Sequence, residues 1–147
     1  MEDIRVRPAV LSDIPSIQAI LLSCRDELPQ LEPDSLTALL ARNVRRGSTA
    51  VAELSNKAIG VCVWSPPLSR ISLLAVMPEA RGMGAASRLM ETALTALPGQ
   101  EVTVETFTEA DPRGRAARTL YHKFGFLPEQ LLSGYDTPME QLKLRRG

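Results

Sequence analysis

The sequence has few of the residues on which metal sites, disulfide scaffolds and nucleic-acid interfaces depend. Its 147 residues include two cysteines and one histidine, and no C-x-x-C pair. Structural metal sites and disulfide scaffolds need clusters of these residue types. Lysine and arginine together number 17, as do aspartate and glutamate, so the positive excess typical of nucleic-acid binding is missing. We therefore expect no metal, no disulfide and no nucleic-acid partner.

Long apolar runs are also missing. No stretch approaches the roughly 20 apolar residues of a membrane-spanning helix. The N-terminal residues MEDIRVRP carry two acids and lack the apolar segment of a signal peptide. We therefore expect a cytoplasmic protein without a membrane partner. The length and the apolar fraction of 44% predict one domain that spans residues 1–147.

Apolar periodicity predicts the element order β-α-α-β-β-β-α-β-α-β-β. This order predicts an α/β fold with a mixed, mostly antiparallel sheet of about seven strands flanked by about four helices. Its two strand–helix units are the places where neighbouring strands would run parallel. The expected strands cover 4–10, 49–54, 58–64, 71–76, 101–107 and 126–132, with a last one within 139–144; the expected helices begin near 14, 35, 83 and 116.

A stretch rich in glycine and alanine, ARGMGAASRLM, follows the apolar segment LLAV and opens a predicted helix. A Walker A loop is excluded because the lysine and hydroxyl of G-x-x-x-x-G-K-[ST] are absent. The dinucleotide pattern G-x-G-x-x-G begins at Gly82 and Gly84 but has serine at its third glycine, which makes it a weak alternative. The pattern [Q/R]-x-x-G-x-[G/A] is complete from Arg81 to Ala86. Small residues at a helix N-terminus let a pyrophosphate approach free N–H groups, although glycine also begins helices for purely structural reasons.

Two longer motifs distinguish these interpretations. V-x-P-x-x-R-G-x-G runs from Val76 to Gly84, and A-x-x-L-Y-x-K-x-G-F runs from Ala117 to Phe126. Together they resemble the acetyl-CoA motif and the C-terminal motif of the GCN5-related N-acetyltransferase (GNAT) superfamily, and the element order agrees over nearly the whole chain. The resemblance implies an N-acetyltransferase that uses acetyl-CoA as co-substrate and no metal.

The resemblance also implies how the cofactor would be held. The main chain of Leu74, Ala75 and Val76 would pair with the acetyl carbonyl and the pantetheine amides, as an added strand would. Arg81 stands at the leading basic position of the first motif. The asparagine that many members carry seven residues before the motif tyrosine is Gly114 here, which removes one expected cofactor contact. The N–H groups that would hold the pyrophosphate belong to Gly82, Met83, Gly84, Ala85 and Ala86.

Direct acetyl transfer needs a proton donor and a proton acceptor. Tyr121 lies where many members place the tyrosine that protonates the departing CoA thiolate, and a phenol with a reference pKa of about 10 is neutral at pH 7. Glu105, on the polar face of its strand, is our candidate base for the amine, while Glu53 and Glu101 are alternatives, and a solvent-facing role is open for all three. The two cysteines have no recognisable activating partner, so no acetyl-cysteine is expected.

The acceptor is expected to be a primary amine of a small molecule or peptide. It would be bound by the first two helices, the loops around 25–33 and 65–70, and the C-terminal hairpin. The alternative is a non-catalytic acyl-CoA-binding sensor or protein-interaction module, which would share the pyrophosphate loop; Tyr121 favours the enzyme. Edge strands of the predicted sheet would allow a homodimer.

Overall fold

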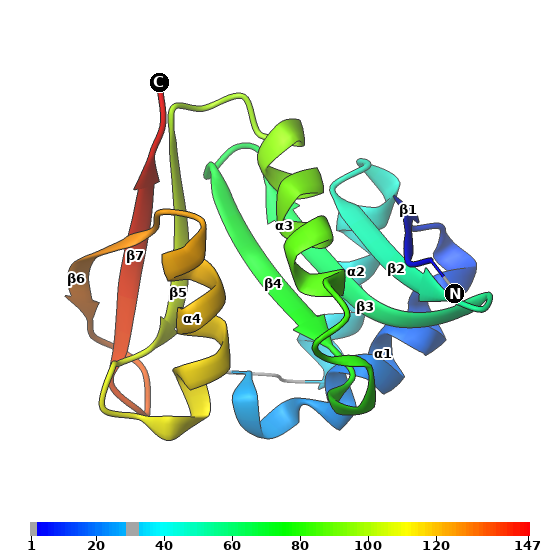
Figure 1. Cartoon of the computed structure of the whole chain (residues 1–147), viewed down its shortest axis with the longest axis horizontal. Helices are drawn as coiled ribbons and strands as arrows, with labels where there is room; N and C mark the ends of the chain where they lie inside the picture. Colours follow the sequence, from blue (N-terminus) through cyan, green and yellow to red (C-terminus); the bar gives the residue numbers. More distant parts are fainter. Residues whose placement is uncertain (1–2, 29–32) are drawn as a thin grey trace.

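Seven strands form one sheet in the order β1-β2-β3-β4-β5-β7-β6, and helices cover both of its faces (Figure 1). The computed structural model describes residues 3–28 and 33–147. The strands are β1 (Arg5–Pro8), β2 (Thr49–Leu54), β3 (Lys57–Ser65), β4 (Arg70–Val76), β5 (Glu101–Phe107), β6 (Leu127–Leu132) and β7 (Met139–Arg145). The α-helices are α1 (Ile14–Ser23), α2 (Pro33–Arg45), α3 (Ala85–Ala96) and α4 (Arg115–Lys123), and the 3-10 helices are η1 (Leu11–Asp13), η2 (Arg25–Glu27), η3 (Pro78–Ala80) and η4 (Pro112–Gly114).

The predicted mixed sheet is confirmed, with one difference in its parallel pairs. The strand–helix unit β4–α3–β5 does place its two strands side by side in parallel. In the unit β5–α4–β6 the strands are not neighbours, because β7 inserts between them and pairs antiparallel with both. Sequence patterns cannot show this insertion, since the periodicity of a strand does not name its partner.

Two helix boundaries differ from those predicted. The second helix begins at Pro33, two residues earlier than the expected start at 35; proline is favoured at that first position. The third helix begins at Ala85, two residues later than expected. Gly82 and Gly84 have φ values of 82° and 88°, which no right-handed helix contains.

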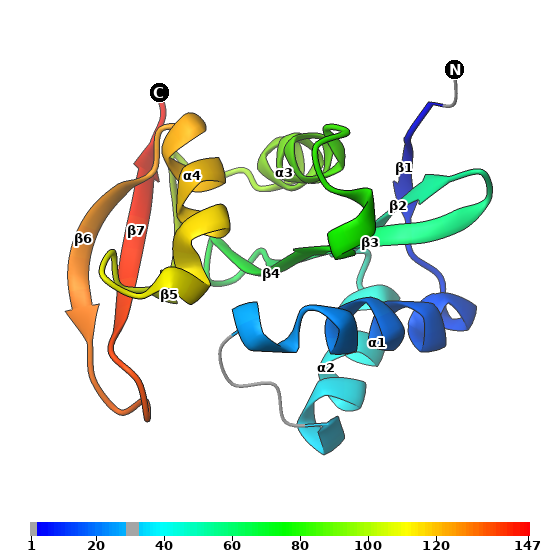
Figure 2. The same cartoon turned by 60° about the horizontal axis from the view of Figure 1, so that its bottom comes forward.

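The two faces of the sheet carry separate apolar clusters. On one face, α3 and α4 cover a cluster that includes Cys62, Leu89 and Tyr121. On the other, α1 and α2 cover a cluster that includes Cys24 and Val61 (Figure 2). Both cysteines are therefore core residues, and burial raises the pKa of the Cys62 thiol. None of the described helices has the length and apolarity to span a bilayer.

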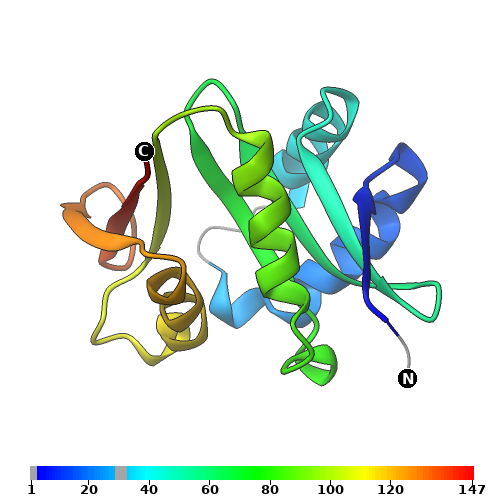
Figure 3. The same cartoon turned by 45° about the horizontal axis from the view of Figure 1, so that its top comes forward.

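The sheet opens between β4 and β5. Their parallel pairing is confined to Arg70 with Thr103 and Ile71 with Val104, and from there the two strands diverge (Figures 1 and 3). A bulge contributes to this, because Val63 pairs with Leu73 and the next residue of β3 pairs with Ile71, which leaves Ser72 without an opposite residue. The open end faces the loop before α3 and the start of α4.

Candidate active site

A cavity of about 550 Å³ lies where β4 and β5 diverge. Its walls are formed by these strands, the loop before α3, α4 and the η2 segment. Because α4 and η2 lie on opposite faces of the sheet, the cavity reaches both faces (Figure 2). The sequence-predicted site residues that line it are Leu74, Ala75, Val76, Arg81, Gly82, Gly84, Ala85, Ala86, Glu105 and Tyr121. Met83 is about half exposed and is not part of the lining.

The loop before α3 presents main-chain atoms to the cavity. A Cβ placed on Gly82 or Gly84 would meet no atom within 4 Å, so the surface of the loop is open. The first bond of the helix runs from Arg88 N–H to the Gly84 carbonyl at 3.1 Å, which leaves the N–H groups of Ala85, Ala86 and Ser87 without intrahelical partners. These N–H groups and the positive end of the helix dipole suit an anion such as a pyrophosphate.

A lysine side chain also lies at this end of α3. The sequence motif did not predict its position there. Lys123 Nζ donates to Ser87 Oγ at 3.1 Å, and both residues line the cavity. Lys123 is the lysine of the L-Y-x-K motif, so its residue type was visible in the sequence. Its position beside the first turn of α3 depends on how α4 packs against α3, which periodicity does not show.

The edge of β4 that faces the cavity exposes alternate main-chain groups. Met77 N–H donates to the Ile59 carbonyl of β3 at 2.8 Å. Because main-chain groups alternate sides along a strand, those of Ala75 point toward β3, whereas those of Leu74 and Val76 point into the opening. We expected Leu74, Ala75 and Val76 to pair with pantetheine. Of these three residues, Leu74 and Val76 are therefore the two whose main-chain groups point into the opening between β4 and β5.

Tyr121 is buried in the wall of the cavity. The residue is 6% exposed, and its ring packs on Phe126 with the two centroids 5.8 Å apart. Its hydroxyl has no hydrogen-bond partner in the part of the chain that the structure describes. Burial raises the pKa of Tyr121, and the nearby Cys62 adds to the effect, so the hydroxyl remains a proton donor at neutral pH.

Of the three candidate glutamates, Glu105 is the one in the cavity wall. Glu53 pairs with Arg7 near the β1 edge at 3.1 Å. Glu101 is exposed and pairs with Lys143 and Arg145. The sequence favoured Glu105 only slightly over Glu53 and Glu101 as the candidate base. Its position in the cavity wall now distinguishes Glu105 from the other two.

Glu105 approaches the cavity from the face opposite Tyr121. Val104 packs in the same cluster as Tyr121, so strand alternation turns Glu105 to the other face. There its carboxylate pairs with Arg70 Nη1 at 3.2 Å and accepts a hydrogen bond from the Tyr135 hydroxyl. Sequence reasoning missed both partners, because Tyr135 comes from the turn between β6 and β7 and no local pattern links it to β5.

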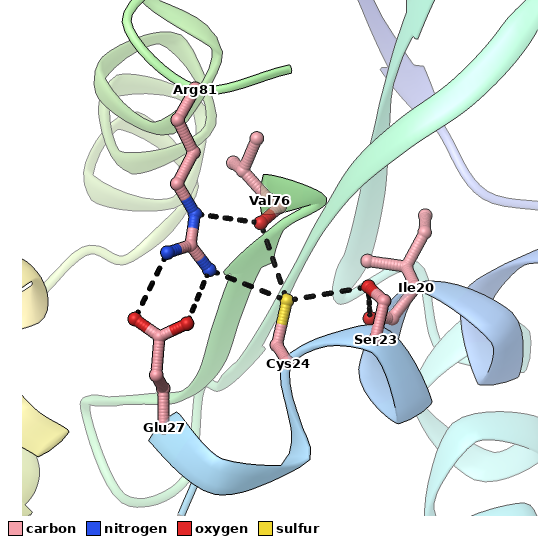
Figure 4. Close-up of polar contacts among 6 residues, drawn as sticks. All are labelled: Ile20, Ser23, Cys24, Glu27, Val76 and Arg81. Atoms are coloured by element: carbon pink, nitrogen blue, oxygen red, sulfur yellow. Dashed lines mark hydrogen bonds and ion pairs between the residues drawn. The ribbon is translucent and has the colours of Figure 1, made fainter. Parts of the chain in front are cut away.

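The Arg81 side chain makes contacts that its motif position did not suggest. Its guanidinium holds the Glu27 carboxylate with two hydrogen bonds, of 2.7 and 3.0 Å, and Nε donates to the Val76 carbonyl at 3.1 Å (Figure 4). Nη2 also lies 3.5 Å from Cys24 Sγ. These contacts involve residues far apart in the chain, so no spacing in the sequence points to them. The expected acceptor loop around 25–33 is seen as far as Leu28; residues 29–32 lie outside the described residues.

Comparison with known proteins identifies the family of this fold. The family model of the acetyltransferase (GNAT) domain matches residues 45–128, which is more than half of the chain. This chain belongs to the GNAT acetyltransferase family. No curated protein matches its sequence.

Solved GNAT structures share the fold over nearly the whole chain. A GNAT-family acetyltransferase from Bacillus cereus is 19% identical with a TM-score of 0.80, and the match covers 99% of both chains. Ard1 from Thermoplasma volcanium is 24% identical with a TM-score of 0.80, covering 98% of each chain. A NatC complex bound to a Gag peptide and CoA contains a chain that is 22% identical with a TM-score of 0.76, covering 99% of each. At these identities the likeness establishes the fold.

The departure of this GNAT chain at Gly114 has a structural reason. A Cβ at Gly114 would lie 2.9 Å from Phe107 Cβ, a separation that a real side chain could adopt only if its surroundings moved. The arginines beside it are engaged elsewhere, because Arg113 pairs with Asp111 at 2.7 Å and Arg118 with Glu140 at 2.8 Å. The asparagine that the resemblance led us to expect would therefore fit at this position only if Phe107 moved.

The single histidine of this GNAT chain lies outside the cavity wall. His122, which follows Tyr121 on α4, is exposed. Within residues 3–28 and 33–147, no three histidine, cysteine, aspartate or glutamate side chains gather as metal ligands would.

Proposed function

We propose that this GNAT chain acts as a single-domain N-acetyltransferase that moves the acetyl group of acetyl-CoA directly to a primary amine of a small molecule or peptide. One observation carries the proposal: Tyr121 lines the cavity, and its hydroxyl, kept protonated by its raised pKa, has no hydrogen-bond partner among the described residues. The hydroxyl is not among the fully buried unpaired atoms of the described residues, so it is open to the cavity and could donate to the sulfur of a departing thiolate.

The cavity suits acetyl-CoA, which supplies an activated acetyl thioester. The open loop at Gly82 and Gly84 and the free N–H groups of the first turn of α3 would hold the pyrophosphate. Lys123 adds positive charge at that end. The outward main-chain groups of Leu74 and the N–H of Val76 would pair with the pantetheine arm.

Two proton transfers complete the reaction. The amine nitrogen forms a bond to the acetyl carbonyl carbon while the carbon–sulfur bond breaks. Glu105 takes the proton that the amine loses, directly or through water, and Tyr121 gives a proton to the sulfur. The products are the acetylated amine and CoA thiol. The placement of Glu105 and Tyr121 on opposite faces agrees with direct transfer, because amine and thioester would meet between them.

The first experiment measures CoA release and product mass for wild-type protein with acetyl-CoA and a panel of peptide N-termini, lysine peptides and polyamines. On the best amine, Tyr121→Phe should lower kcat by about 100-fold or more while the Kd for CoA stays unchanged. Because the pKa of Tyr121 is raised, its ionisation should cost wild-type activity only above pH about 10. His122→Ala, an exposed neighbour on the same helix, is the matched control.

Three further results would distinguish the proposed enzyme from a non-catalytic acyl-CoA sensor and test the roles of Tyr121 and Glu105. Full activity of Tyr121→Phe would remove the general-acid role. CoA binding without turnover on any amine would favour an acyl-CoA sensor. Glu105→Gln should lower kcat strongly, whereas Glu101→Gln, on the same strand but outside the cavity, should not.

A further inference from the structure

Three chain segments meet at the Arg81 side chain. Arg81 itself comes from the loop before α3, Val76 ends β4, and Glu27 belongs to η2, which follows α1 (Figure 4). Cys24, between α1 and η2, completes the group: its thiol donates to the Val76 carbonyl at 3.3 Å and its sulfur lies 3.5 Å from Arg81 Nη2. All four residues line the cavity.

The hydrogen-bonding capacity of this group is nearly used up. A guanidinium has five N–H donors, and four of them are directed at Val76, Cys24 and the two oxygens of Glu27. The Glu27 carboxylate also offsets the positive charge of Arg81. The Val76 carbonyl accepts from both Arg81 and Cys24, which fills the two lone pairs of a carbonyl oxygen.

The segment held by Arg81 forms the wall on the amine side of the cavity. Glu27 and Leu28 line the cavity on the face of the sheet opposite α4. The groups suited to the pyrophosphate lie at the start of α3 and at Lys123 of α4. If the cofactor is held there, the amine must approach from the η2 side, where Glu105 also lies.

We propose that Arg81 is a positioning residue, whose side chain holds η2 against the end of β4 and so shapes the amine side of the cavity, while the pyrophosphate is left to main-chain N–H groups and Lys123. This inference rests on the proposed function for the identity of the two ligands. It assigns Glu27 the same role, because the Glu27 carboxylate is the partner through which Arg81 holds η2.

Two conservative variants test the proposal. Glu27→Gln keeps the shape of the side chain but removes its charge, and Arg81→Lys keeps the charge but cannot hold two carboxylate oxygens and a carbonyl together. Each should raise the KM for the amine by about threefold to fivefold, as expected for loss of a part-exposed ion pair. Each should leave the Kd for CoA within about twofold of the wild-type value. The double variant should be no worse than the poorer single variant, because both remove one interaction.

The matched control is Glu79→Gln, an exposed glutamate of η3. It removes the same charge near the same loop and should change neither constant. If Arg81 instead served the phosphate, Arg81→Lys would weaken CoA binding by about tenfold or more and Glu27→Gln would tighten it, because its Arg81 would be released. Either result would overturn the proposal, as would an amine KM unchanged in both variants.

Amide exchange makes the test independent of turnover. Glu27 N–H donates to the Cys24 carbonyl at 2.8 Å and Leu28 N–H to the Arg25 carbonyl. Both amides should exchange faster in Glu27→Gln and Arg81→Lys than in wild type or Glu79→Gln, while amides of α4 keep their protection. If no amine is acetylated, the proposed function fails, yet faster exchange would still show that Arg81 holds η2; unchanged exchange would contradict the positioning role itself.

Discussion

Gly84 shows how much of the candidate site depends on single main-chain positions. It precedes α3 with φ of 88°, and the space beside its Cα is open. A residue with a side chain is strained at this φ by about 1–2 kcal/mol. A side chain would also enter the space that we assign to the pyrophosphate. The two effects can be separated, because another glycine in the chain shares the geometry but not the site.

Gly84→Glu should weaken CoA binding by about tenfold or more, since it places bulk and negative charge where an anion is expected. Gly47, after α2, has φ of 78° and equally open surroundings, so Gly47→Glu should lose similar stability but keep its CoA affinity. Calorimetric titration with CoA and thermal unfolding measure the two effects. Equal CoA affinity in both variants would place the pyrophosphate elsewhere.

The residues proposed for proton transfer were visible in the sequence, but their surroundings were not. Tyr121 was identified by its motif, and Glu105 was the candidate base, with Glu53 and Glu101 as alternatives. The contacts of Glu105 with Arg70 and Tyr135 join β4, β5 and the β6–β7 turn. Such contacts depend on which strands are neighbours, and a single-sequence pattern does not contain that information.

At the scale of elements, the unpaired main-chain groups at the two ends of α3 are treated differently. Its N-terminus presents free N–H groups to the cavity, whereas its C-terminus is closed by Arg146 from the chain's last residues. The guanidinium donates to the carbonyls of Leu94 at 2.6 Å, Gly99 at 2.9 Å and Leu97. A cation at this end also complements the helix dipole.

Removing this cation should destabilise the protein. Arg146→Ala leaves the last carbonyls of α3 without charged donors, so we expect a loss of about 1.5–3 kcal/mol in the free energy of unfolding. Arg145→Ala is the matched control, because Arg145 is exposed and its ion pairs with Glu101 and Glu129 lie at the surface; it should cost less than about 1 kcal/mol. Urea unfolding of both variants measures the difference, and equal losses would contradict this role of Arg146.

At the scale of the whole molecule, the sheet has an N-terminal part, β1 to β4, and a C-terminal part, β5 to β7. Few main-chain pairs join the two parts, but many apolar side chains pack across them. Register pairs connect β4 to β5 at two positions. One apolar cluster nevertheless extends from Ile4 and Trp64 in the N-terminal part to Val104, Tyr121 and Leu142 in the C-terminal part. A core shared in this way favours unfolding of both parts together.

We therefore predict one cooperative unfolding transition for the whole chain. Trp64, the single tryptophan of the sequence, is buried in the shared cluster, so its fluorescence reports on the core, while far-UV circular dichroism reports on all four α-helices. In urea the two signals should give the same midpoint. Separate midpoints would contradict the single-domain proposal, because they would show that the two parts of the sheet unfold independently.

The sequence by itself determined the element types, the family and the main-chain loop at the start of α3. These depend on periodicity, glycine and local motifs, which act over a few neighbouring residues. The tertiary structure decided that β7 lies between β5 and β6, that Glu105 and not Glu53 or Glu101 reaches the cavity, and that the Arg81 side chain holds η2. Each of these is a contact between segments distant in the chain, and its geometry follows from the packing of the whole sheet, which no local pattern encodes.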